Sequence, residues 1–116
     1  MPIQSIRIEF ISAKLNPYDI AELLYVKKIL IALNITLAPI TINNNASNIA
    51  YIDIKQWFDN ENTNKITRNL KCSNIYSINI ESTNYDWFIS AIPANFIPLN
   101  NSSTTVKINP LYYYVI

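Results

Sequence analysis

Two acidic residues come nearest to a catalytic arrangement in this sequence. Glu9 and Asp53 lie in segments predicted to be neighbouring strands, where they could act as an acid and a base. No nucleophile or electrophilic group converges with them, so a solvated face with Arg7 as the counter-ion is the favoured interpretation. We therefore expect no catalytic residue and a protein that is not an enzyme.

The chain has no His and no Gly, and these absences remove whole classes of site. Without His there is no Ser-His-Asp or Cys-His catalysis, and the commonest metal ligand is missing. Without Gly there is no phosphate-binding loop of the GxGxxG or GxxxxGK type. The lone Cys72 can form neither an intramolecular disulfide nor a zinc site. We expect no cofactor and no metal.

Length and composition indicate one compact domain. Half of the 116 residues are hydrophobic and 15% are charged, which is not the balance of a disordered chain. The net charge of +1 lacks the basic surplus of a dedicated duplex-DNA binder. Residues 1–5 show no secretory-signal pattern, and the apolar run 20–33 is too short to span a bilayer, so we expect no membrane partner. The 22 Ile and 17 Asn residues indicate an adenine- and thymine-rich genome.

Hydrophobic periodicity and turn residues predict the order of the elements. The segments are strand 6–11, helix 17–33, strand 35–42, strand 48–54, a helix from Asp59 or Asn60 to Leu70, and strand-like runs 76–81 and 85–92. This order is that of the α+β ferredoxin-like, or split βαβ, sandwich, an antiparallel sheet with two helices on one face. The first and third strands then lie side by side in the centre, and the second lies at an edge, where Pro39 is tolerated.

The same periodicity predicts which side chains face the core, and local signals predict the turns. Asn43 and Asn44 belong to a turn cluster, 43–47, in which Asn stands in for Gly in left-handed backbone. Trp87 and Phe88 should point to opposite faces of one strand. The expected core positions are Ile6, Ile8 and Phe10 on the first strand, Ile20, Leu23, Val26, Leu30 and Leu33 on the first helix, Ala50, Ile52 and Ile54 on the third strand, and Thr63, Ile66 and Leu70 on the second helix.

The amino-acid composition changes after Pro93. Prolines and the polar loop 100–105 precede a possible strand at 105–108 and an apolar end at 111–116. We therefore divide the chain into a domain, 1–93, and a C-terminal arm, 94–116. The end of the arm has no charge and is rich in aromatic and β-branched residues, which predicts an extended strand. That strand would add to the domain's own sheet or to another chain, the second being favoured.

Several short segments together carry a resemblance to a known group of proteins. They are Glu9-Phe10-Ile11, Pro17-Tyr18-Asp19-Ile20-Ala21, Ala50-Tyr51-Ile52-Asp53-Ile54, Trp57-Phe58-Asp59-Asn60, Arg68-Asn69-Leu70 and Asp86-Trp87-Phe88. These segments resemble small uncharacterised proteins of nucleocytoplasmic large DNA viruses of the mimivirus type. The resemblance covers roughly residues 6–92 and implies a fold like that of the RNA-recognition motif, a viral source and no established activity.

RNA-recognition motifs stack unpaired bases on aromatic residues of two central strands. Here the third-strand motif aligns with residues 47–54, where only Ala50, Tyr51 and Ile52 match, and the stacking position of the first strand is Arg7. Arg7 and Tyr51 could stack on bases, but the nearby carboxylates would repel the RNA backbone. Single-stranded RNA binding through Arg7 and Tyr51 is therefore kept as the alternative function and not as the leading one.

Surplus apolar residues favour a protein partner or a homo-oligomer instead. Several apolar side chains lie off the predicted core stripe of the first helix, and three tyrosines stand near the C-terminus. The leading prediction is a non-enzymatic protein–protein interaction or assembly module of a large DNA virus, in the virion or in the host cytoplasm. The predicted partner-binding residues are Leu24, Tyr25, Ile31, Tyr112, Tyr113 and Tyr114.

Overall fold

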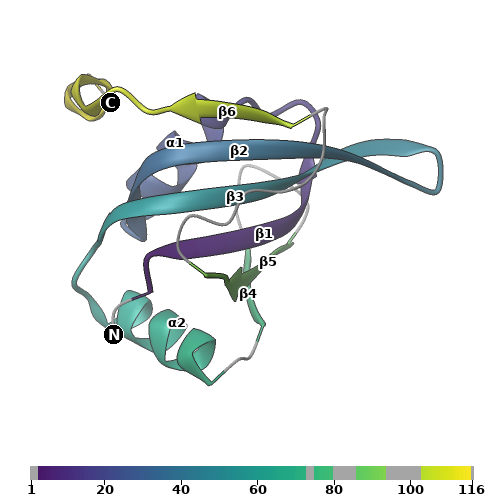
Figure 1. Cartoon of the computed structure of the whole chain (residues 1–116). Coiled ribbons are helices and arrows are strands. Elements are labelled where there is room, and N and C mark those ends of the chain that lie inside the picture. Colours follow the sequence, from purple (N-terminus) through teal and green to yellow (C-terminus); the bar gives the residue numbers. More distant parts are fainter. Residues whose placement is uncertain (1–2, 73–74, 80–85, 94–102, 116) are drawn as a thin grey trace.

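The computed structural model describes residues 3–72, 75–79, 86–93 and 103–115, which form an α+β fold with one antiparallel sheet (Figure 1). This confirms the predicted α+β class with an antiparallel sheet and two helices. In chain order the elements are β1 (Ser5–Ser12), α1 (Pro17–Val26), β2 (Leu30–Ile42), β3 (Asn45–Trp57), α2 (Glu61–Lys71), β4 (Tyr76–Asn79), β5 (Asp86–Ala91), β6 (Thr104–Lys107) and the 3-10 helix η1 (Pro110–Tyr114).

The six strands are ordered β4-β5-β1-β3-β2-β6, and every neighbouring pair is antiparallel. The predicted pairing of the first and third strands is confirmed, since β1 lies against β3, with Ile6 opposite Ile52. The prediction that the second strand lies at an edge is wrong, because β6 pairs with β2 from Asn34 to Leu37. Pro39 lies beyond that stretch, and among the described residues β2 pairs there with β3 alone, so the missing N–H of Pro39 costs no ladder bond to β6. The arrangement is compatible with a ferredoxin-like fold.

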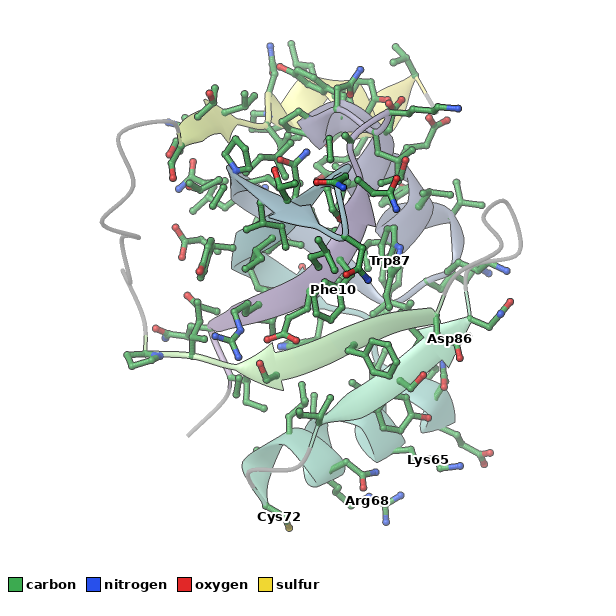
Figure 2. The ribbon with its side chains drawn as sticks, turned by 90° about the vertical axis from the view of Figure 1, so that its right-hand side faces the viewer. Phe10, Lys65, Arg68, Cys72, Asp86 and Trp87 are labelled. Carbon is green, nitrogen blue, oxygen red and sulfur yellow. The ribbon has the colours of Figure 1, made fainter. Side chains whose placement is uncertain are left out.

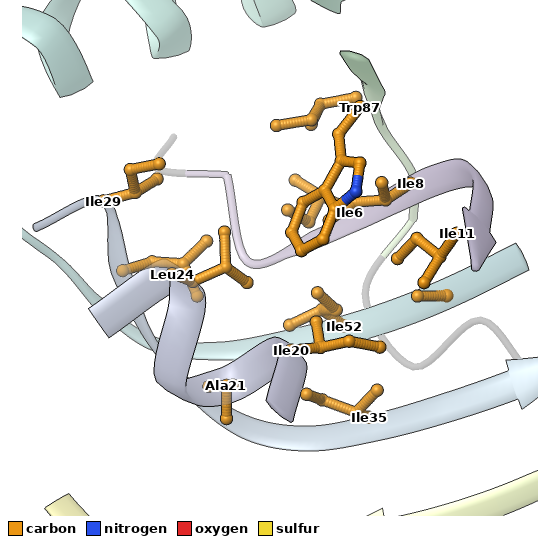
Figure 3. Close-up of a cluster of buried hydrophobic side chains, with 14 of the residues drawn as sticks. Ile6, Ile8, Ile11, Ile20, Ala21, Leu24, Ile29, Ile35, Ile52 and Trp87 are labelled. Atoms are coloured by element: carbon orange, nitrogen blue, oxygen red, sulfur yellow. The ribbon is translucent and has the colours of Figure 1, made fainter. Parts of the chain in front are cut away.

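One hydrophobic core joins both helices to one face of the sheet. It includes Ile6, Ile8, Ile52 and Ile89 of the strands, and Trp87 is 1% exposed among them (Figure 3). The helices contribute Ile20, Ala21 and Leu24 from α1 and Ile66 and Leu70 from α2. The opposite faces predicted for Trp87 and Phe88 are confirmed, because Phe88 is 40% exposed.

Helix α1 ends seven residues earlier than predicted, at Val26 rather than Leu33. Lys28 has a φ of 56°, a left-handed conformation that turns the chain out of the helix, and Leu30 then pairs with Trp57 of β3. The predicted core stripe is therefore wrong at Val26 and Leu33, which are exposed. Pairing with β3 satisfies the backbone hydrogen bonds of the residues from Leu30 onward as well as a helix would, and it also extends β2 along β3.

Strand β1 contains a bulge that the simple alternation missed. One extra residue lies between Ile8 and Ile11, where β1 faces Ala50 to Asn48 of β3. Phe10 has a φ of 60° and is exposed, whereas Ile11 is fully buried, so the predicted core position of Phe10 is wrong. Left-handed backbone costs a non-glycine residue about 1–2 kcal/mol. Burying Ile11 contributes about 1.5–3 kcal/mol, which is enough to offset that cost.

Two local predictions are confirmed. Asn60 caps α2 by accepting a hydrogen bond from the Thr63 N–H at 2.9 Å, and Thr63, Ile66 and Leu70 are the buried residues of that helix. Asn43 and Asn44 both have positive φ and connect β2 to β3 as a two-residue hairpin turn of the I′ kind. Asn thus replaces the missing Gly. The β2–β3 hairpin projects beyond the rest of the sheet (Figure 1).

Candidate functional site

The C-terminal segment is built onto the outer side of β2. After β6 pairs with β2, the Ile108 N–H donates to the Leu33 carbonyl at 2.9 Å. The Asn109 side chain then accepts a hydrogen bond from the Leu111 N–H at 2.9 Å, and Pro110 occupies the first turn of η1. The extended strand predicted for 111–116 is therefore wrong over residues 111–114, which lie in η1, and residue 116 lies outside the described residues. An Asn cap followed by Pro favours a helical turn, whose internal hydrogen bonds satisfy the backbone without a strand partner.

Tyr113 fastens η1 to β2 through its hydroxyl group. The hydroxyl accepts a hydrogen bond from the Ala32 N–H at 3.0 Å and donates one to the Ala32 carbonyl at 2.8 Å. One side chain thus satisfies both backbone groups of Ala32 next to the stretch that β6 covers. Burial raises the pKa of Tyr113, since the charged phenolate would lose its hydration there. β6 and η1 therefore dock against the domain's own sheet.

Aromatic rings join η1 to α1. Tyr112 meets Tyr18 edge-on with ring centroids 5.0 Å apart, and Tyr113 meets Tyr25 at the same distance. Tyr25 in turn packs edge-on against Phe58 at 5.7 Å. Such pairs contribute about 0.5–1.5 kcal/mol each beyond their buried area. Partial burial and the nearby Glu22 carboxylate raise the pKa of Tyr112. Tyr112 and Tyr113 therefore hold η1 in place.

Three other apolar residues of this region point to solvent. Leu111, Tyr114 and Val115 are 67%, 84% and 79% exposed, and we call them the C-terminal patch. Sequence reasoning identified Tyr114 but missed Leu111 and Val115. For Leu111 the missed signal is the 3-10 spacing, which places residues three apart, here Leu111 and Tyr114, on the same side. Beside the patch lies a hollow of about 190 Å³ lined by Tyr25, Ile31, Lys55, Pro110, Tyr113 and Tyr114.

The predicted partner-binding set divides in the structure. Tyr25, Ile31 and Tyr114 line the same hollow. Leu24 does not, because it is fully buried in the core, and its assignment to a partner surface is wrong. The error follows from the phase of α1: the buried residues are Ile20, Ala21 and Leu24, a stripe rotated from the predicted one.

The two residues of the RNA alternative come together on the other face of the sheet. Arg7 and Tyr51 are direct partners across β1 and β3. The Arg7 guanidinium is already bound to the Glu9 carboxylate at 2.9 Å. Phe88, which lies opposite Glu9 on β5, adds an exposed aromatic ring beside them. This face could stack bases, but Glu9 partly neutralises the positive charge of Arg7.

The acid–base pair considered from the sequence does not form. Ser5 of β1 is opposite Asp53 of β3, and Glu9 lies four residues further along β1, about 13 Å away at the rise of a strand. Glu9 contacts Arg7, while Asp53 accepts hydrogen bonds from Ser5 and Asn34. The two carboxylates therefore occupy separate surroundings.

Three other charged or reactive side chains lie apart from both of these surfaces. Lys65, Arg68 and the exposed thiol of Cys72 lie on the outer side of α2 and point away from the sheet (Figure 2). Within residues 3–72, 75–79, 86–93 and 103–115, no group of three or more His, Cys, Asp or Glu could hold a metal ion. Within those residues, no helix is long and apolar enough to cross a membrane.

Comparisons of the chain with protein-family models, with curated proteins and with solved structures found no match.

Proposed function

We propose that this protein is a non-enzymatic interaction module that binds a protein partner through the C-terminal patch and the adjoining hollow. The observation that carries the proposal is the orientation of η1. Tyr112 and Tyr113 are directed inward, while Leu111, Tyr114 and Val115 are exposed on a segment anchored to Ala32. An apolar patch on a fixed support is typical of a protein interface.

The hollow beside the patch supports the same function. Tyr25, Tyr113 and Tyr114 contribute to its walls, and aromatic residues are enriched at the centres of protein interfaces. Because η1 is held by hydrogen bonds and ring contacts, little conformational freedom remains to be lost on binding. The arm therefore presents a preformed surface.

Replacing two patch residues tests the proposal. The double variant Leu111→Ser, Tyr114→Ser should lose self-association measured by light scattering, or lose the binding of proteins retained by the immobilised wild-type chain. Ile75→Ser is the matched control, because Ile75 is 62% exposed outside the patch and its replacement should change neither readout. If the double variant and the wild type have the same mass and the same retained proteins, the patch is not the interface.

The setting proposed for this function is a large DNA virus, either in the virion or in the host cytoplasm. Its support is the resemblance carried by segments such as 50–54 and 86–88, together with the Ile- and Asn-rich composition. The finer fold proposed with it is the RNA-recognition-motif-like form of the split βαβ plan. The strand neighbours β1 and β3 support that form.

Single-stranded RNA binding is the second candidate, and the direct pairing of Arg7 with Tyr51 favours it. Tyr51→Ala should weaken the binding of a mixed-sequence RNA by about 1–3 kcal/mol through the loss of a stacked base. Arg7→Ala should weaken it too and reduce its salt dependence. If the wild-type protein does not bind such RNA at low salt, this candidate is excluded.

A further inference from the structure

A pocket of about 370 Å³ lies where β1 and β2 begin and β3 ends. The polar residues in its lining are Gln4, Ser5, Asn34, Asp53, Lys55 and Gln56. Leu33 and Trp57 are among its apolar walls. The volume falls within the range of about 300–1,000 Å³ that small-molecule sites occupy. This pocket shares Lys55 with the hollow beside the C-terminal patch, but the carboxylate of Asp53 and the amide of Asn34 do not line that hollow.

The carboxylate of Asp53 is held in a defined orientation. The hydroxyl of Ser5, a residue only 2% exposed, donates to one carboxylate oxygen at 2.8 Å, and the Asn34 amide donates to the other at 3.4 Å. In the described part of the chain, no Lys or Arg is paired with Asp53. Each oxygen keeps acceptor capacity for one further donor. The carboxylate is thus positioned to accept two parallel hydrogen bonds from one ligand.

Two consecutive bulges shape the wall of this pocket. Between the pairs Ile31–Gln56 and Ala32–Ile54, β3 has one extra residue, Lys55. Between Ala32–Ile54 and Asn34–Asp53, β2 has one extra residue, Leu33. Bulges redirect side chains and are common next to binding sites. Both extra residues line the pocket, so the irregularity of the strands coincides with the hollow.

The charges of the pocket select the ligand. A ligand must present hydrogen-bond donors to Asp53 and a negative group to the ammonium of Lys55. An arginine side chain would satisfy Asp53 but would be repelled by Lys55. Guanine offers two adjacent donors, N1–H and the 2-amino group, which match the two oxygens of a carboxylate, whereas adenine offers one donor on that edge. We infer that this pocket binds a guanine nucleotide, with the base on Asp53 and the phosphate on Lys55.

Titration of the full-length, ¹⁵N-labelled protein with guanosine monophosphate (GMP) tests the inference by NMR. Saturable shifts of the Ser5, Asn34 and Lys55 amides are expected, with a Kd below about 1 mM. Adenosine monophosphate (AMP) should bind at least about tenfold more weakly, since it makes one hydrogen bond fewer to a charged group. Absent shifts in the pocket, or equal affinities for GMP and AMP, would overturn the inference.

Substitutions at Asp53 and Lys55 test the binding of the base and of the phosphate separately. Asp53→Asn should weaken GMP binding about 10–100-fold, while Asp59→Asn, which changes an exposed carboxylate outside the pocket, should leave it unchanged. Lys55→Ala should weaken GMP but not guanosine, and Lys55 is exposed, so this variant keeps the inference testable if Asp53→Asn does not fold. Equal loss of GMP and guanosine, or no loss of either, would contradict the placement of the phosphate. Lys55 also lines the hollow beside the C-terminal patch, whereas Asp53 does not, so the result with Asp53→Asn distinguishes a failure of this inference from a failure of the proposed interface.

Discussion

Replacing Tyr113 with phenylalanine removes one hydroxyl group and leaves the ring. The two hydrogen bonds to the Ala32 N–H and carbonyl, at 3.0 and 2.8 Å, are then lost. The ring can still pack against Tyr25, with which it lies 5.0 Å centroid to centroid. The variant therefore isolates the contribution of the hydroxyl to the attachment of η1.

Hydrogen bonding sets the expected magnitude. A neutral hydrogen bond contributes about 0.5–1.5 kcal/mol net, so Tyr113→Phe should lower the free energy of unfolding by about 1–3 kcal/mol. For a urea slope of roughly 1–3 kcal/mol/M, the midpoint should fall by about 1 M. Exchange of the Ala32 amide hydrogen should accelerate as well, because its acceptor is removed.

Tyr114→Phe is the matched control. It makes the same chemical change in the same helix, but Tyr114 is 84% exposed, and its effect should stay within about 0.5 kcal/mol. If both variants unfold at the same urea concentration as the wild type, and Ala32 exchanges at its original rate, then the hydroxyl of Tyr113 does not secure the arm. The support for a preformed C-terminal patch would be lost with it.

Three further outcomes follow from the core, a helix cap and the partly buried phenols of η1. Trp87→Ala should lower the free energy of unfolding by about 3–5 kcal/mol in urea titrations, and a loss below about 1 kcal/mol would contradict its central place in the core. Asn60→Ala should cost about 0.5–2 kcal/mol in the same assay, because the Thr63 N–H loses its acceptor. Tyr112 and Tyr113 have folded-state pKa values above 10.0, so their contribution to stability is complete below about pH 10 and is lost as the pH rises through the folded values. The fall in urea midpoint between about pH 9 and about pH 11 should therefore be smaller in the double variant Tyr112→Phe, Tyr113→Phe, and an equal fall would refute this assignment.

Elements built from contacts between near neighbours were predictable from the sequence alone. Helix α2 begins at the Asn60 cap and buries Thr63, Ile66 and Leu70 as the spacing predicts. The hairpin turn at Asn43 and Asn44 follows from the tolerance of Asn for left-handed backbone. The order of strands and helices, and with it the pairing of β1 and β3, also follows from local periodicity combined with the rules of connection.

The site depends on contacts between residues far apart in the chain, and the sequence determined only part of it. Tyr25, Ile31 and Tyr114 were each predicted to bind a partner, and only the fold places them around one hollow. Leu24 was misassigned, because an apolar stripe on a short helix can be drawn in more than one phase and only the position of the sheet selects one. The contact of Asp53 with Ser5 joins residues 48 positions apart. Nothing local to either residue predicts it.

Where α1 ends, where β1 bulges and how the arm docks were decided only by the tertiary structure. The run after Val26 is apolar enough for helix or strand, and its pairing with β3 selects the strand. Phe10 takes a left-handed conformation that its own sequence disfavours, because this conformation buries Ile11. The aromatic residues after Pro110 suit a strand by propensity, but residues 110–114 form η1, since the Asn109 cap and Pro110 favour a helical turn and this turn lets Tyr113 reach the backbone of Ala32. In each case the burial of apolar side chains and the satisfaction of backbone groups outweigh local preferences of about 1 kcal/mol.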